Sequence, residues 1–157
     1  MRHRARILAS CWLAALALAL AACGTLDTSQ LEQLVSERIE AVIGFAPASV
    51  DCPKDVEAKA GDVFSCTVTG SDGSTAEIEV TQKNDEGNVD VAGNLLKTQQ
   101  LEQAIKDQLG ATEVSCPEIV AVEAGKTVDC DAAAGSDKAT IVVTIENDNG
   151  DVTFQRR

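Results

Sequence analysis

Cysteine is the residue type in this sequence whose chemistry depends most on its neighbours. Six cysteines occur in 157 residues. A cysteine thiolate can carry a lipid, close a disulfide, ligate zinc or act as a nucleophile. Two of the six lie near the start of the chain, and the other four form two pairs, each 14 positions apart: Cys52 with Cys66, and Cys116 with Cys130. The two groups need separate interpretations.

Cys23 ends the run Leu20-Ala21-Ala22-Cys23, which resembles a bacterial lipobox. It follows a basic start with three arginines and an apolar stretch over 7–22. This stretch is shorter than a membrane-spanning helix, which needs about 20 residues. Small residues directly before a peptidase cleavage site are typical of a secretory signal peptide. We expect residues 1–22 to be a cleaved lipoprotein signal peptide and Cys23 to be lipidated. The alternatives are an uncleaved membrane helix and a signal peptide without lipid.

Removal of residues 1–22 leaves an acidic chain with few side chains suited to catalysis. It keeps ten of the 13 Lys and Arg residues and all 25 Asp and Glu residues, a formal charge of −15. Such a surface argues against nucleic acid as a partner. The chain then has no His, Trp, Tyr or Met, which excludes histidine-based nucleophiles and zinc sites. We expect no catalytic residue, no metal ligand and no cofactor, and only a carboxylate-based hydrolase stays open as an enzyme.

The chain contains two copies of one segment, and this sets its architecture. Each copy has a helix-forming stretch, a Cys-Pro pair, a Gly-containing turn and a second cysteine that starts an alternating strand. Each copy is about 60 to 70 residues long, so its core is marginal without a covalent staple. The corresponding ranges are 28–33 with 98–103, 50–53 with 114–117, and 76–89 with 139–152.

One helix is predicted at the start of each copy. Apolar residues recur at helical spacing over 31–42 and 101–109, and a glycine follows each stretch, Gly44 or Gly110. The polar faces of both helices are predicted to be solvated surface, and Glu32 lies on that of the first helix. The candidate N-caps are Ser29, in a capping box with Glu32, and Thr98.

Short strands follow each helix. Apolar and polar residues alternate over 64–68 and 76–80, which predicts half-buried strands, and a last strand is predicted at 89–91. In the second copy Asn149-Gly150 is a hairpin signal. We therefore expect an α+β fold of two tandem repeats, each with an N-terminal helix packed on a three- to four-stranded antiparallel sheet and one disulfide.

The repeat favours the bridges Cys52–Cys66 and Cys116–Cys130 among the three possible connectivities, because each copy then closes its own bridge. Closing such a loop stabilises a unit by roughly 3 kcal/mol, and an exported protein meets the oxidising conditions that preserve the bond. The alternatives are bridges between the copies, a four-thiolate zinc site and a redox pair. The last two prefer a Cys-x-x-Cys spacing, which is absent here.

The pattern Val50-Asp51-Cys52-Pro53, then Ala60-Gly61 and Phe64-Ser65-Cys66, resembles a domain of actinobacterial lipoproteins and membrane proteins catalogued as domain of unknown function 4333. Two copies cover nearly all of the mature chain. The second copy departs from the pattern at Val128, which stands where the first has Phe64. The resemblance implies an outward-facing envelope protein with two structural disulfides, and it implies no catalytic residue.

These observations lead to a functional expectation. We expect a non-enzymatic binding or interaction module on the outer face of the plasma membrane, with a tether at 23–27 and repeat domains at 28–93 and 95–157. Its partners would be the membrane, through the lipid anchor, and an unidentified envelope protein or small ligand, with the groove between the repeats as the expected ligand site. The alternative function is a carrier of a small apolar or lipid ligand, which needs an apolar cavity above about 300 Å³.

Overall fold

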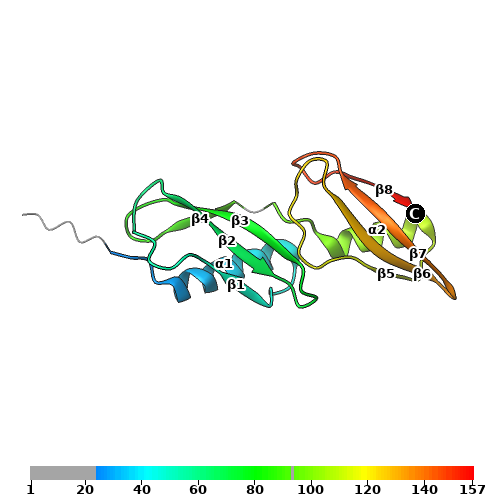
Figure 1. Cartoon of the computed structure of the whole chain (residues 1–157), viewed down its shortest axis with the longest axis horizontal. Helices are drawn as coiled ribbons and strands as arrows, with labels where there is room; N and C mark the ends of the chain where they lie inside the picture. Colours follow the sequence, from blue (N-terminus) through cyan, green and yellow to red (C-terminus); the bar gives the residue numbers. More distant parts are fainter. Residues whose placement is uncertain (1–23, 93) are drawn as a thin grey trace, which may run out of the picture.

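The computed structural model describes residues 24–92 and 94–157, so the predicted signal peptide and Cys23 lie outside the described residues. Each repeat is one helix on a four-stranded antiparallel sheet whose strands follow chain order (Figure 1). This confirms the predicted α+β architecture. The first repeat contains α1 (Thr28–Ile43), β1 (Ser49–Asp51), β2 (Val63–Thr69), β3 (Thr75–Gln82) and β4 (Val89–Ala92). The second contains α2 (Thr98–Leu109), β5 (Glu113–Ser115), β6 (Thr127–Ala134), β7 (Asp137–Ile145) and β8 (Val152–Arg156).

The alternation of side chains along each strand decides which sheet face the helix covers. In β2 and β3 the facing residues Cys66 and Ile78 are buried at 0% and 2% exposure. The neighbouring pair, Thr67 after Cys66 and Glu77 before Ile78, points to the other face of the sheet, which is exposed to solvent. The second repeat follows the same rule, so each sheet has one apolar and one wet face.

The first helix begins at a different cap from the predicted one. Asp27 is the N-cap, and its Oδ1 accepts hydrogen bonds from the amides of Ser29 and Gln30 at 3.0 and 3.1 Å. The predicted capping box of Ser29 with Glu32 is therefore wrong, because the helix starts earlier and Glu32 lies in its second turn. Instead, Glu32 Oε1 accepts from the amide of Cys52 at 3.2 Å.

The second helix has no side-chain cap. Lys97 occupies the N-cap position, and its side chain makes no capping hydrogen bond. Thr98, the predicted cap, is the first helical residue and is buried, with Oγ1 donating to the carbonyl of Glu118 at 3.4 Å. The predicted stops are confirmed, since Gly44 and Gly110 end the helices with left-handed φ values of 93° and 67°.

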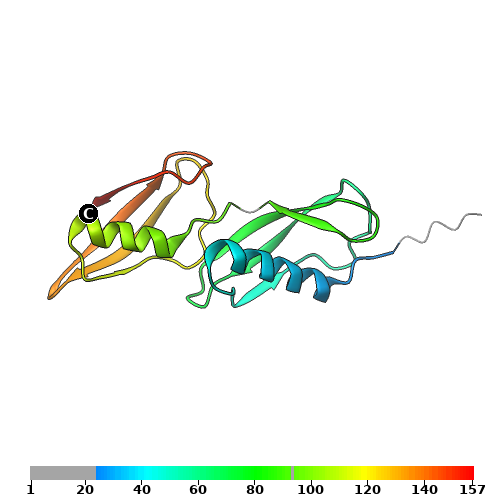
Figure 2. The same cartoon turned by 180° about the vertical axis from the view of Figure 1, so that it is seen from behind.

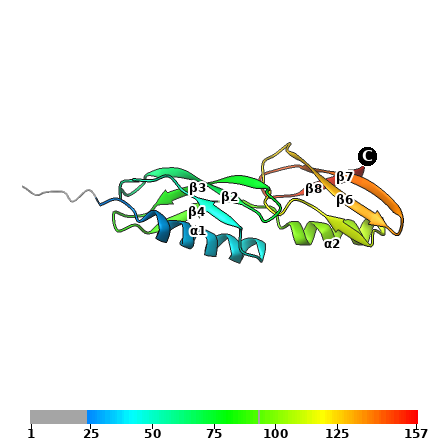
Figure 3. The same ribbon diagram turned by 60° about the horizontal axis from the view of Figure 1, so that its bottom comes forward.

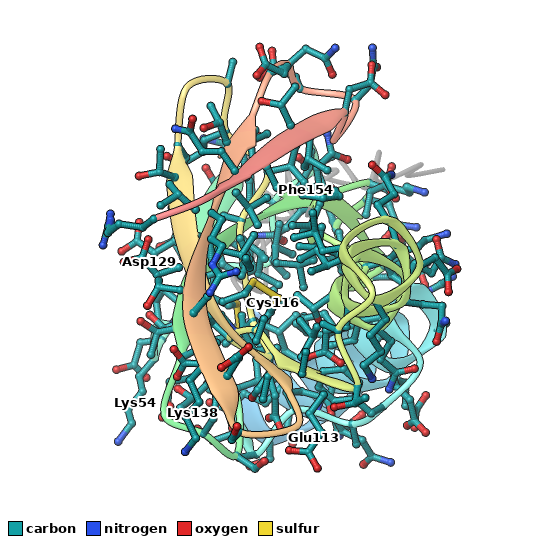
Figure 4. The ribbon with its side chains drawn as sticks, turned by 90° about the vertical axis from the view of Figure 1, so that its right-hand side faces the viewer. Lys54, Glu113, Cys116, Asp129, Lys138 and Phe154 are labelled. Carbon is teal, nitrogen blue, oxygen red and sulfur yellow. A yellow bond between two sulfur atoms is a disulfide. The ribbon has the colours of Figure 1, made fainter. Side chains whose placement is uncertain are left out.

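Both predicted disulfides are present, Cys52–Cys66 and Cys116–Cys130. Figure 4 looks along the molecule from its C-terminal end and shows the bridge at Cys116 between the second sheet and α2. Phe154 lies on that inner side of the sheet, and Asp129 lies on the outer side. Each bridge thus joins the segment after the first strand of a sheet to its second strand, within the layer that the helix covers.

The repeats follow one another along the long axis of the molecule (Figures 1 and 2). Both helices lie on one side and both sheets on the other (Figure 3). The repeats are not independent, because Leu95, Ile119 and Ala121 of the second repeat belong to the buried core of the first.

Candidate binding groove at the junction of the repeats

The extended segment 94–96 before α2, which we call the lead-in strand, builds the apolar part of the junction. Leu95 forms a β-bridge with Ala121. On either side of it, the amide of Leu96 donates to the carbonyl of Val120 at 2.9 Å, and the amide of Val122 donates to Asn94 at 2.7 Å. This pairing presents Leu95 and Ala121 to the first repeat, where they are at most 9% exposed.

Polar contacts fasten the same junction. We call residues 70–74, the turn between β2 and β3, the junction hairpin, and residues 118–121 the docking segment. Glu118 accepts from the amide and the hydroxyl of Ser71, both at 2.6 Å. In return, the amide of Glu118 donates to Asp72 at 2.9 Å, and the next amide donates to Ser74 Oγ at 2.8 Å. Four hydrogen bonds therefore join the hairpin of one repeat to the docking segment of the other.

Gly70 makes this close approach possible. A Cβ atom at this position would lie 3.0 Å from the Cβ of Glu118. It would also lie 2.8 Å from an oxygen of Asp72 and 2.9 Å from the hydroxyl of Ser74. The side chains of Asp72 and Ser74 would have to turn away, and Glu118 would have to move back by a few tenths of an ångström, so glycine suits this position.

The charge of Asp72 is held in place by the junction. Burial alone would raise the pKa of its carboxyl group. Hydrogen bonds from the Ser74 side chain and the Glu118 amide outweigh burial, so the pKa lies below its ordinary value of 3.8. Asp72 is therefore a charged acceptor at neutral pH, which strengthens the bonds it receives.

A groove of about 830 Å³ lies beside this junction. Its walls come from α1 and β4 of the first repeat, and from α2 and the turn between β7 and β8 of the second. Nine of its 15 lining residues are apolar, among them the buried Leu96 and Leu101. A smaller hollow of about 230 Å³ shares Val42, Val91 and Leu95 with the groove and continues it along α1. The expected groove between the repeats is thus present.

A few polar groups stand along the apolar walls, as in ligand sites. Asn94 donates to the carbonyl of Asp148 at 3.1 Å and ties the β7–β8 turn to the lead-in strand. Lys97 lines the groove and makes no salt bridge with the residues that the structure describes. The groove therefore combines apolar walls with an available cation.

A second hollow, of about 820 Å³, lies within the second repeat alone. Its lining includes the carboxylates of Glu113 and Asp131 and the cations of Lys138 and Arg157. Figure 4 shows Glu113 and Lys138 at the rim of the sheet, away from α2. Ligand sites favour domain interfaces, so the junction groove is the stronger candidate.

Other predicted chemistry can be checked against the described residues. In ranges 24–92 and 94–157 the buried polar residues are Gln82 and Thr98, so no pair of carboxylates is buried there. Gln82, which sequence reasoning missed, donates to the carbonyl of Glu57 and accepts from the amide of Lys59, both at 2.8 Å. Over the same ranges no cluster of three His, Cys, Asp or Glu side chains suits a metal, and no helix is long and apolar enough to cross a membrane.

Comparison with known proteins gives one match. The sequence pattern of one protein family, described as a domain of unknown function (DUF4333), matches residues 7–87 and 91–150. The two matched segments correspond to the two repeats of the fold. No curated protein and no solved structure matches the chain.

Proposed function

The chain belongs to the DUF4333 family, and we propose that it is a non-enzymatic protein of the cell envelope, anchored by a lipid on Cys23, whose two repeats form one binding module. The description of the family carries no activity, so the proposal relies on this chain's own residues. It combines the N-terminal sequence, the two disulfides and the groove at the junction.

The anchoring part of the proposal is supported by sequence. Cys23 follows an apolar stretch with the small residues of a lipobox. Residues 24–27, which we expected to belong to a tether, instead pack on the first repeat, since the carbonyl of Gly24 accepts from the amide of Ala58 at 2.7 Å. A lipid on Cys23 would therefore hold the first repeat next to the bilayer. Disulfides in both repeats fit a compartment in which thiols oxidise.

The observation that carries the binding role is the joint construction of the groove. Val42 and Val91 come from one repeat, and Leu96 and Val152 from the other. The four hydrogen bonds and the shared core fix these walls relative to one another. A preformed groove avoids part of the ordering cost of binding.

Mass spectrometry of the intact protein, isolated from native membranes without reduction, tests the anchoring. We expect a chain beginning at Cys23 that carries an acyl mass and lacks four thiol hydrogens. The Cys23→Ser variant should lose the acyl mass and leave the membrane fraction while both bridges stay closed. An unprocessed N-terminus without lipid, or free thiols in the exported protein, would contradict the proposal.

A second candidate function is a carrier of a small apolar or lipid ligand. The size and lining of the groove favour it, because its volume of about 830 Å³ exceeds the about 300 Å³ of small ligand sites and nine of its 15 lining residues are apolar. The two candidate functions differ in what occupies the groove: a small apolar or lipid ligand in a carrier, and part of another protein in an interaction module.

A further inference from the structure

The groove at the junction has a counterpart in the first repeat. A hollow of about 360 Å³ lies at the start of α1, next to its own lead-in strand and the turn between β3 and β4. All twelve residues that line it correspond to residues of the junction groove, and six of the twelve are identical. The repeats thus supply an internal control: shared residues belong to the scaffold, and differing residues report what is particular to the junction.

The clearest difference is in charge: the lining of the first hollow is negative, and that of the junction groove is balanced. The lining of the first hollow includes three carboxylates and no cation, whereas that of the junction groove includes one carboxylate and one cation. Lys97 stands where the first repeat has Asp27, and Asn149 stands where it has Glu86. Asp148 is shared, since it corresponds to Asp85. The cation is therefore the charge that distinguishes the junction groove.

Lys97 is unfavourable for the helix that it begins. In the first repeat the side chain of Asp27 accepts hydrogen bonds from two backbone amides at this position, whereas the side chain of Lys97 accepts none. A cation near a helix N-terminus also opposes the helix dipole. Stability alone would favour the aspartate, and departures from local rules of this kind concentrate at functional positions. The residue that departs from the rule lines the groove.

The second difference is that the junction groove is larger than the first hollow and has more apolar lining. Ala104 stands where the first repeat has Leu34, which removes bulk from the wall. The junction adds Val42 and Val91 from the first repeat, and Val42 is 44% exposed. Three changes between equivalent grooves thus act together: more space beside Ala104, additional apolar wall and a cation in a chain of formal charge −12.

We propose that the junction groove binds a single-chain amphiphile with an anionic head, a carboxylate or a phosphate. Its alkyl chain lies against Val42, Val91 and Val152, and its head pairs with Lys97. Charge complementarity selects this occupant, because an uncharged alkyl ligand would give no reason for a lysine in place of a capping aspartate. The inference relies on the proposed function only in taking the groove as the binding site.

The test uses the mature chain with Cys23→Ser, so that no attached lipid competes for the groove. Four ten-carbon amphiphiles serve as probes: decanoate, decyl phosphate, uncharged decyl maltoside and decyltrimethylammonium. Binding is followed below micellar concentrations by NMR of the valine methyl groups. We expect both anions to shift the methyl signals of Val42, Val91 and Val152, and to bind at least tenfold more tightly than the cation. Whichever anion binds more tightly identifies the head as carboxylate or phosphate.

Two substitutions exchange the differing residues between the repeats. Lys97→Asp should weaken decanoate about tenfold, which corresponds to about 1.4 kcal/mol, while the midpoint of thermal unfolding stays the same or rises because α2 gains a cap. Lys138→Asp is the matched control, since it makes the same charge change beside the second hollow and should leave affinity within twofold. Ala104→Leu should weaken all four probes together, because it narrows the shared alkyl site.

Several results would overturn the inference. Equal affinity for decanoate and decyltrimethylammonium, or no effect of Lys97→Asp, would refute the role of Lys97. Weakening by Lys138→Asp alone would move the anion to the second hollow. If the uncharged or cationic probe binds tightly at the same methyl groups, the head-group assignment fails while the groove stays the binding site of the proposed function. If no probe reaches these methyl groups, the lipid-binding inference fails, and the anchor on Cys23 is judged by mass spectrometry alone.

Discussion

Gly70 controls how closely the two repeats approach. Gly70→Ala should destabilise the protein by about 1–3 kcal/mol, the range for forcing extra bulk into a packed contact, because its Cβ would lie 3.0 Å from that of Glu118. Urea denaturation of both proteins measures the change. Gly24→Ala is the matched control, because no atom lies within 4 Å of a Cβ there. Equal stability of the two variants would show that the hairpin moves freely.

Asp72 makes the junction sensitive to acid. Its pKa is lower in the folded protein, because hydrogen bonds from Ser74 and Glu118 outweigh the effect of burial. Its contribution is therefore complete above the ordinary value of 3.8 and is lost as the pH falls through the lowered folded-state value. We expect the protection of the Glu118 amide hydrogen against exchange, measured relative to the rate in an unstructured chain at the same pH, to fall at low pH more than that of amides in β6. The Asp72→Asn variant should lose this difference, and a difference of the same size in the variant would contradict the assignment.

Two glutamates show how far residue roles follow from sequence. The sequence predicts that Glu32 lies on a solvated surface, yet its carboxylate accepts from the amide of Cys52, and Glu102 accepts from the amide of Cys116 at 2.9 Å. Helical periodicity cannot predict this, because the contact crosses from the helix to a distant loop. The available signal was the repeat itself, since both copies carry glutamate at the same helical position.

The sequence predicts the positions of the helices and strands better than the residues at which they begin and end. Alternation along 64–68 and 76–80 predicts strands, and both lie within β2 and β3 with the expected faces buried. The cap of α1 was misplaced because Asp27 and Ser29 are both good capping residues two positions apart. Only the backbone conformation at Asp27 separates them, with φ −72° and ψ 106° outside the helical region.

Each disulfide should matter as an element of its own repeat. Replacing Cys52 and Cys66 together by alanine should lower the free energy of unfolding by about 3 kcal/mol, because the cross-link restricts the unfolded chain. The equivalent replacement at Cys116 and Cys130 is the matched comparison, since each bridge spans 14 positions. Both are measured by urea denaturation of the oxidised parent and the variants. A loss below 1 kcal/mol in both would show that the small cores suffice without them.

At the scale of the whole molecule, the repeats should unfold together. Ile119 belongs to the second repeat but packs in the core of the first, at 3% exposure. Ile119→Ala should cost about 2–5 kcal/mol and accelerate hydrogen exchange in α1 and β3. Ile105→Ala, in the core of the second repeat, is the control and should affect α2 first. Unchanged exchange in α1 after Ile119→Ala would mean that the first repeat is stable alone.

The junction was the part of the fold that sequence could not supply. The predicted domains at 28–93 and 95–157 follow one another almost directly, and a groove between them is expected, but the sequence names no contacts there. The signal was the difference between the copies: Leu95, Ile119 and Ala121 stand where the first copy has Thr25, Asp55 and Glu57. Reading that difference requires knowing that these positions share one surface, which follows from the pairings of Thr25 with Glu57 and Leu95 with Ala121.

The same three polar residues of the first copy prevent a further copy from docking on it as the second copy does. Thr25, Asp55 and Glu57 are exposed, so an upstream copy would meet charge where docking needs apolar surface. At the distal end Ala134 stands at the position of Gly70, and the turn between β6 and β7 has two residues, 135–136, where the junction hairpin has five. Further copies joined to either end would therefore not dock as these two do. Docking would require aliphatic residues at positions 25, 55 and 57 for an upstream copy, or a five-residue turn between β6 and β7 for a downstream copy.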